Sequence, residues 1–256
     1  MRNQKTITIA GRAFHLEGDD QDTYFTNTMK DGEDFNDVPV IYARKYVPAG
    51  GVILDVGANI GTSACGFSDV VGANGKVLSI EASPNIYSML AHNMQSNQLA
   101  NVECFNVAMS DHPGTLMFRD QDIFLAGSRV VASGGVPVRA GTLDQFVEDA
   151  NLTKIDFIKI DVEGHERQVL EGAVNTIQRF KPKCLVEINA YVMIVLNREL
   201  PQPLLECIRK MFPYIYKVQR GGKGILEHMP TDDIFWMNHL LTGCCDDLLC
   251  GFDALL

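Results

Sequence analysis

A dense set of ionisable side chains lies in the stretch DFIKIDVEGHE. Lys159, Asp161 and Glu163 are spaced by two, so they share one side of an extended strand, and His165 follows shortly after. A neutral imidazole or a carboxylate can take a proton from a hydroxyl group near neutral pH. The spacing therefore indicates a reacting centre, with His165 as general base, Glu163 orienting the group that loses its proton and Asp161 binding an amino group of a cofactor or of the substrate.

Structural roles for the same residues stay open. Lys159 is expected close to an apolar sheet surface, where an ion pair with Asp161 or Glu187 would only hold the end of the strand. His165 could cap a helix without taking part in chemistry. Asp161, Glu163 and Glu187 could also supply oxygen ligands to Mg²⁺, although nothing in their spacing demands a metal.

A glycine-rich turn, DVGANIGTSA at 55–64, follows an apolar strand and opens a predicted helix. Gly57 and Gly61 allow a sharp turn and a close approach of backbone to ligand, and Asn59 tolerates a positive φ. Open α/β sheets bind ligands at this end of their strands. Because the middle glycine of G-x-G-x-x-G is missing, no pyrophosphate site is indicated.

The next predicted strand ends in Glu81. A carboxylate there can accept hydrogen bonds from both hydroxyls of an adenosine ribose, as in sites for NAD or S-adenosylmethionine. The strand after it ends in FNVAMSD, whose backbone and small side chains could border an adenine. The predicted cofactor-binding residues are Asp55, Gly57, Ala58, Asn59, Gly61, Thr62, Glu81, Ala82, Asn106, Val107, Ala108 and Asp161.

Strands and helices must alternate to position these residues. Apolar or β-branched runs predict strands at 52–57, 76–82, 101–108, 154–161 and 183–189. Helices are predicted from Ser83-Pro84 to about Asn97, after the capping box formed by Thr142 and Gln145, and from Gly164 to Lys181-Pro182. This order predicts an α/β fold with a mostly parallel sheet and helices on both faces.

The ends of the chain and one insertion depart from this alternation. Residues 1–48 are predicted to form an N-terminal extension or cap, and residues 49–256 the main domain. The extension holds a possible hairpin and an acidic stretch, Asp31 to Asp37, that could cap the sheet, help close the substrate site or simply form a solvated layer. Residues 109–140 are predicted to be an inserted loop or small hairpin. YIYKVQR and DIFWMN are predicted to be two further strands at an antiparallel edge.

Composition excludes several classes of protein. The chain has 256 residues, 46% hydrophobic and 21% charged, as expected for a folded protein without a membrane span. Its formal net charge of -10 disfavours a partner gripped through phosphates, so no nucleic acid is expected. Seven Cys residues in apolar stretches and the lack of a signal-peptide pattern favour buried thiols and a cytoplasmic location.

The GANIGT and DFIKIDVEGHE motifs together resemble the FkbM family of S-adenosylmethionine-dependent methyltransferases, over about residues 50–190. The resemblance implies a Rossmann-like class I methyltransferase fold, with a seven-stranded, mostly parallel sheet whose last strand is antiparallel. It also implies S-adenosylmethionine as cofactor and O-methylation of a hydroxyl on a sugar or natural product. The expected partner is therefore a hydroxylated small molecule or glycan.

Two other classes of function compete with O-methylation. A non-catalytic scaffold could keep the nucleotide pocket, although the intact DVEGHE stretch argues against a decayed site. A nicotinamide-dependent oxidoreductase would use the same ribose carboxylate, but the missing glycine of the turn opposes it.

Overall fold

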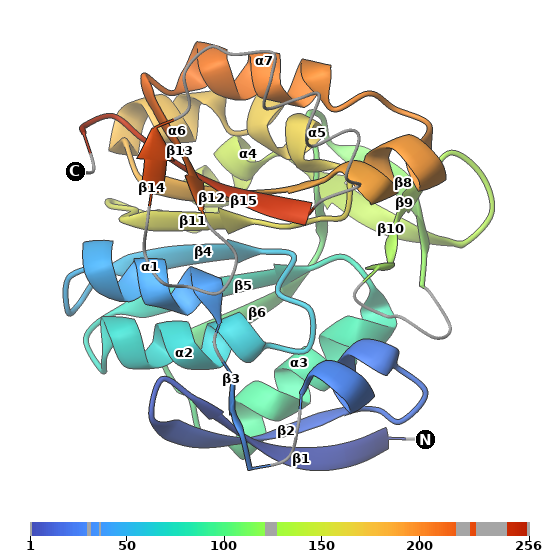
Figure 1. Ribbon diagram of the computed structural model, residues 1–256, viewed down its shortest axis with the longest axis vertical. Helices are drawn as coiled ribbons and strands as arrows, with labels where there is room; N and C mark the ends of the chain where they lie inside the picture. The colour runs from blue at the N-terminus through green and yellow to red at the C-terminus, as the bar shows by residue number, and fades with distance from the viewer. Residues whose placement is uncertain are drawn as a thin grey trace.

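The apolar runs of the sequence form the central sheet of the protein (Figure 1). The computed structural model describes residues 2–29, 32–35, 37–120, 127–218, 226–228 and 245–254. The strand order of this eight-stranded sheet is β14-β13-β15-β12-β11-β4-β5-β6. The strands are β4 (Val52–Val56), β5 (Lys76–Glu81), β6 (Val102–Asn106), β11 (Phe157–Ile160), β12 (Lys183–Asn189), β13 (Tyr214–Val218), β14 (Leu226–His228) and β15 (Cys245–Gly251).

Most of the sheet is parallel. Strands β6, β5, β4, β11 and β12 run in one direction, and β15 runs antiparallel between β12 and β13. Every residue of β4 and β11 is buried, as expected for strands covered on both faces. The predicted sheet with an antiparallel last strand is confirmed, and the short β14 adds an eighth strand beside β13.

The last strand is not one of those expected from the sequence. YIYKV forms β13 as predicted, whereas DIFWMN lies outside the described residues. The strand inserted between β12 and β13 is β15, which begins with Cys245 and two acidic residues. These acids mask the strand pattern, while Leu248, Leu249 and Cys250 behind them are fully buried.

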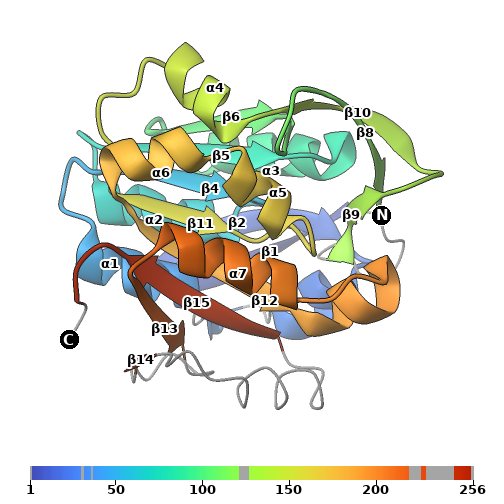
Figure 2. The ribbon, with the colours of Figure 1, turned by 90° about the horizontal axis from the view of Figure 1, so that it is seen from above.

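Helices cover both faces of the central sheet (Figures 1 and 2). On one face lie α1 (Val38–Tyr46), α2 (Thr62–Val71) and α3 (Pro84–Ser96), and on the other lie α4 (Leu143–Asp149), α5 (Glu166–Glu171), α6 (Val174–Phe180) and α7 (Gln202–Met211). A separate hydrophobic cluster fills each side. Phe157 of β11 belongs to the first cluster and Ile158 to the second, as strand alternation requires.

The predicted helix starts are confirmed, but one predicted helix is two. Ser83 Oγ and Thr142 Oγ1 each accept a hydrogen bond from a first-turn amide. The helix expected between Gly164 and Lys181 is broken between α5 and α6 at Gly172. A Cβ at Gly172 would lie 2.0 Å from the carbonyl oxygen of Ser110, so this close backbone contact requires glycine and interrupts the helix.

The N-terminal residues form a layer beneath α3 (Figure 1). The predicted hairpin is confirmed: β1 (Arg2–Ile9) and β2 (Arg12–Asp19) are antiparallel, and β3 (Asp34–Phe35) joins β1 after the short helical turn η1 (Tyr24–Thr28). Apolar side chains of β1 and β2 belong to the same hydrophobic cluster as α2 and α3. The N-terminal segment therefore shares a core with the main sheet.

The inserted segment forms its own small sheet. Strands β7 (Ala108–Met109), β8 (Gly114–Arg119), β9 (Arg129–Val131) and β10 (Val136–Gly141) pair in the order β7-β10-β8-β9. After β12, the chain continues through the short turn η3 (Val192–Asn197) to α7. The predicted small hairpin is thus one part of a four-stranded sheet.

Several smaller expectations can be compared with the described residues. Cys65, Cys184 and Cys250 are buried free thiols, as predicted, whereas Cys104 and Cys207 are free thiols that are only partly buried. The aromatic residues Phe212 and Tyr216 are buried in the core, and Trp236 lies outside the described part of the chain. None of the helices in that part is long and apolar enough to cross a membrane.

Replacing Gly172 tests the contact between the α5–α6 break and Ser110. We expect Gly172→Ala to lower the free energy of unfolding by about 1–3 kcal/mol, because the added methyl group must displace backbone. Gly141→Ala is the matched control, since a Cβ there meets no atom within 4 Å. Urea denaturation measures both; equal stability of the two variants would contradict the prediction.

Candidate active site

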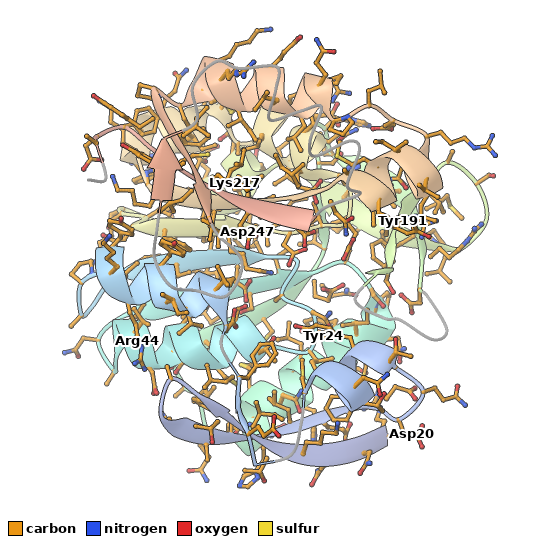
Figure 3. All side chains as sticks on the ribbon, in the orientation of Figure 1. Asp20, Tyr24, Arg44, Tyr191, Lys217 and Asp247 are labelled. Carbon is orange, nitrogen blue, oxygen red and sulfur yellow. The ribbon has the colours of Figure 1, made fainter. Side chains whose placement is uncertain are left out.

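A pocket of about 470 Å³ opens at the carboxyl ends of the parallel strands. Residues just after β4, β5, β11 and β12 line it, together with segments from both ends of the chain. Tyr24 of the N-terminal segment and Asp247 of β15 both line it and lie towards the middle of the molecule in Figure 3. The pocket stands where an α/β sheet binds its ligands.

The glycine turn forms the floor of the pocket. Gly57, Asn59 and Gly61 have φ angles of 80°, 51° and 99°, which confirms the positive φ expected at Asn59. A Cβ at Gly57 would lie 1.7 Å from the carbonyl oxygen of Asp161, so the turn packs directly against the segment after β11. Only glycine permits both this φ and this contact.

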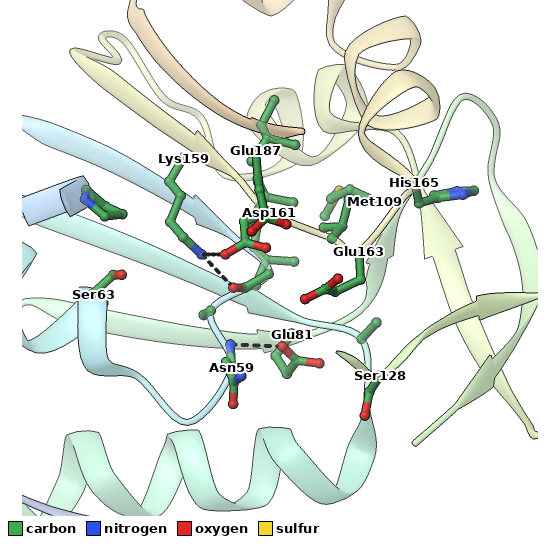
Figure 4. Close-up of a pocket in the computed structure, with 18 of the residues that line it drawn as sticks. Asn59, Ser63, Glu81, Met109, Ser128, Lys159, Asp161, Glu163, His165 and Glu187 are labelled. Carbon is green, nitrogen blue, oxygen red and sulfur yellow. Dashed lines mark hydrogen bonds and ion pairs between the residues drawn. The ribbon is translucent and has the colours of Figure 1, made fainter. Parts of the chain in front are cut away.

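Glu81 lies beside the turn, buried, and lines the pocket (Figure 4). Its Oε2 accepts a hydrogen bond from Asn59 N (3.0 Å), and its Oε1 accepts one from Ser83 N (2.9 Å). Burial raises the pKa of Glu81 to about 7 in spite of these two bonds. Each oxygen keeps a lone pair for a ligand hydroxyl.

Lys159 occupies the other side of the turn. Its Nζ donates to the carbonyl oxygen of Gly57 (2.8 Å) and lies 3.2 Å from Asp161 and 3.6 Å from Asp55. Burial alone would lower the pKa of Lys159, but the two carboxylates raise it above its ordinary value. The predicted pairing with Asp161 is therefore present, and Asp55 is a second partner.

Three carboxylates meet in front of this lysine. Asp161, Glu163 and Glu187 each place an oxygen within 4.8 Å of the others. Glu163 adopts a φ of 53°, and burial together with Asp161 and Glu166 raises its pKa to about 9. The oxygens fit part of a Mg²⁺ coordination shell, and Lys159 already provides a positive charge beside one of them.

His165 lies at the edge of the pocket, and its ring points away from the carboxylates in Figure 4. As predicted, it stands at the beginning of a helix, where it is the N-cap residue of α5. Its Nε2 lies 3.0 Å from Ser110 Oγ, in hydrogen-bond contact. Burial lowers the pKa of His165 to about 4, so the imidazole is neutral near neutral pH.

The structure brings most of the predicted residues together, but some lie behind the pocket wall. Asp55, Gly61 and Asn106 do not line the pocket. Asp55 lies beneath Lys159, Gly61 packs against α3, and Asn106 donates to the carbonyl oxygens of Glu81 and Ala82. These three residues support the predicted cofactor-binding residues that line the pocket.

Asp144, in the first turn of α4, has a structural role. Its carboxylate accepts hydrogen bonds from the backbone amides of Asn175 and Thr176 at the start of α6. Both of its oxygens are used there, and Asp144 does not line the pocket.

The sequence did not identify several residues that line the pocket. Ser63 follows the glycine turn, and Asn189 is the last residue of β12. Both could have been predicted as pocket residues from these positions in the sequence. Phe118 and Val130, paired across β8 and β9, bring the inserted sheet to the pocket. Their place depends on pairing between distant segments.

The pocket is strongly acidic. Its lining includes one lysine, Lys159, and the acidic residues Asp37, Glu81, Asp161, Glu163, Glu187 and Asp247. Such a lining attracts a cation and repels a pyrophosphate.

Removal of the lysine tests how the site is held together. We expect Lys159→Met to lower the free energy of unfolding by about 3–5 kcal/mol, because Asp55 would become an unpaired buried charge. The double variant Lys159→Met/Asp55→Asn should recover part of this loss. Urea denaturation measures both variants; a loss below about 1 kcal/mol in the single variant would contradict the central role of the lysine.

Known proteins resemble about half of this chain. The hexuronic acid methyltransferase AglP of Haloferax volcanii is 31% identical over 142 residues, which cover 55% of this chain and 57% of AglP. The 2-O-methyltransferase NoeI of Sinorhizobium fredii is 28% identical over 147 residues, which cover 50% of this chain and 59% of NoeI. The matches thus span less than two thirds of either relative.

A solved structure and a family profile also match parts of this chain. The crystal structure of methyltransferase FkbM from Methylobacillus flagellatus KT aligns with a TM-score of 0.49 and 19% identity, over 82% of this chain and 50% of that one. The profile described as Methyltransferase FkbM domain matches residues 55–198, which include the glycine turn, Glu81 and the β11 carboxylates. The chain therefore belongs to the methyltransferase FkbM domain family.

Proposed function

We propose that this protein transfers a methyl group from S-adenosylmethionine to a hydroxyl group of a sugar or related small molecule. The observation that carries the proposal is the acidic pocket built around the glycine turn and Glu81 in a chain of this family. S-adenosylmethionine brings a sulfonium cation and an adenosine ribose. The carboxylates suit the cation, and the two oxygens of Glu81 suit the ribose hydroxyls.

The pocket favours one orientation of the donor. With the ribose at Glu81, the adenine would lie against Val107 and Ala108, as the sequence predicted. The sulfonium would then lie over the glycine turn, next to Asp161. This arrangement leaves the space around Glu163 and Asn189 for the acceptor.

Methyl transfer is an in-line displacement, so much of the catalysis comes from holding the acceptor oxygen close to the methyl carbon. A hydroxyl group must also lose its proton. We propose that Glu163, rather than His165, accepts this proton. Glu163 lies with Asp161 in the group of carboxylates, whereas the imidazole of His165 points away from that group (Figure 4). Lys159 holds Asp161 and the turn. As an alternative to proton transfer to Glu163, a Mg²⁺ held by Asp161, Glu163 and Glu187 would acidify the hydroxyl.

The relatives support a sugar as the class of acceptor. AglP is named for hexuronic acid, and NoeI for methylation at a 2-O position. In this chain, polar groups of Glu163, Glu187 and Asn189 line the acceptor side of the pocket, with Phe118 and Val130 as apolar surface. Polar groups that accept and donate hydrogen bonds beside an apolar wall suit a hydroxylated ring.

Donor binding is the direct test of the proposal. We expect isothermal titration to detect S-adenosylhomocysteine binding and no NADH binding. Glu81→Gln should weaken S-adenosylhomocysteine binding by about 10–100-fold, because an amide cannot accept two ribose hydrogen bonds as a carboxylate does. Binding of NADH without the thioether would instead support an oxidoreductase.

A binding protein without activity would pass that test, so transfer must also be measured. Donor-dependent methylation of hydroxylated metabolites and glycans, followed by mass detection of the added methyl group, separates an enzyme from a scaffold. Tight donor binding without transfer to any hydroxylated acceptor would favour the scaffold.

The dependence of turnover on pH tests the assignment of the base. Glu163 must be deprotonated to accept a proton, and its pKa is about 9 in the free protein. We expect kcat/KM to rise from pH 6 towards pH 9, with an inflection at or below that value because a cationic donor favours the carboxylate. Glu163→Gln should lower kcat by about 100-fold or more and remove the rise.

His165→Ala is the comparison variant for this experiment. If His165, with a pKa of about 4, were the base, the wild-type profile would be flat above pH 6. A flat wild-type profile together with a large loss in His165→Ala would therefore return the role to the histidine.

A further inference from the structure

Asp37 is a pocket carboxylate without a role in the donor and acceptor contacts described so far. Asp37 is 7% exposed and lines the pocket, and its Oδ2 has no hydrogen-bond partner among the described residues. It stands just before α1 but makes no side-chain cap for that helix. A buried carboxylate oxygen left without a donor is costly, so the position implies a donor group supplied by a ligand.

The nearby Lys159 does not donate a hydrogen bond to Asp37 Oδ2. The Lys159 ammonium group donates a hydrogen bond to the Gly57 carbonyl oxygen and forms ion pairs with Asp161 and Asp55. Its positive charge acts on Asp37 only at longer range, and no ion pair joins the two. Burial raises the pKa of Asp37 to about 7, and the nearby Ser63 hydroxyl and Lys159 charge offset this effect only in part.

The start of α2 provides a complementary group next to Asp37. Thr62 and Ser63 begin this helix of ten residues, both line the pocket, and the N-cap residue Gly61 has no side chain to cap the first turn. Free amides and the positive end of the helix dipole favour a carboxylate ligand there. Asp37 can therefore pair with an ammonium group of a ligand, and the start of α2 beside it can bind a carboxylate of the same ligand.

Such a pair matches the amino-acid end of S-adenosylmethionine. Ser63 lies on the Lys159 side of the pocket, while Glu81 lies on the other side of Asn59 (Figure 4). A donor with its ribose at Glu81 would extend across the glycine turn towards Ser63. We infer that Asp37 accepts a hydrogen bond from the α-ammonium group of S-adenosylmethionine, while the α-carboxylate of the same ligand lies at the start of α2. This inference rests on the proposed donor.

This assignment gives the N-terminal segment a part in donor recognition. Asp37 lies outside residues 55–198, which match the family profile. The acidic stretch that the sequence associated with the substrate therefore acts on the methyl donor through this one residue.

The test compares two ligands that differ in the amino-acid part. S-adenosylhomocysteine carries it, and 5′-methylthioadenosine lacks it. By isothermal titration, we expect Asp37→Asn to weaken S-adenosylhomocysteine binding by about 10–100-fold and to change 5′-methylthioadenosine binding by less than about two-fold. Asp20→Asn, an exposed change at the edge of the N-terminal sheet (Figure 3), should alter neither affinity.

The outcomes separate this inference from the proposed function. If Asp37→Asn leaves S-adenosylhomocysteine binding unchanged, or weakens both ligands by the same factor, the assignment of Asp37 is overturned while the donor site stands. If the wild-type protein binds neither ligand, the proposed donor is wrong and the inference fails with it. Selective loss of S-adenosylhomocysteine affinity supports the assignment even if the variant is somewhat less stable.

Discussion

The ammonium group of Lys159 is the contact on which the arrangement of the site depends. It connects β4, through Asp55, with the glycine turn, through the Gly57 carbonyl oxygen, and with the end of β11, through Asp161. All of these groups are buried or partly buried, where an unpaired charge would be costly. The shape of the turn and the direction of Asp161 therefore follow from how a single cation satisfies its neighbours.

One lysine cannot balance all the carboxyl groups that the pocket gathers. Burial and mutual repulsion raise the pKa values of Asp37 and Glu81 to about 7 and that of Glu163 to about 9. A bound cation would reverse these shifts, because it favours the charged form of each group. Cation binding and deprotonation are thus linked, so the same ligand that fills the pocket would prepare Glu163 to accept a proton.

The sequence predicted the parts of the fold that depend on local pattern. Buried strands, helix caps, the positive φ at Asn59 and the pairing of Lys159 with Asp161 all follow from neighbouring residues or strand parity. What it did not predict depends on contacts between distant segments. The break at Gly172 reflects its contact with Ser110, and the pocket position of Asp247 depends on β15 inserting between β12 and β13.

Local contacts and contacts between distant segments also build different parts of the pocket: the first hold the centre of the site, and the second form the surfaces that recognise ligands. The glycine turn and Glu81 are fixed by the parallel strands, whereas Asp37, Asp247 and the strands β8 and β9 reach the pocket from segments that pack around this frame. Substitutions in those segments can change the polarity or width of the pocket while the contacts of Lys159 stay intact. Recognition of different ligands can therefore change without rebuilding the centre at which methyl transfer is proposed to occur.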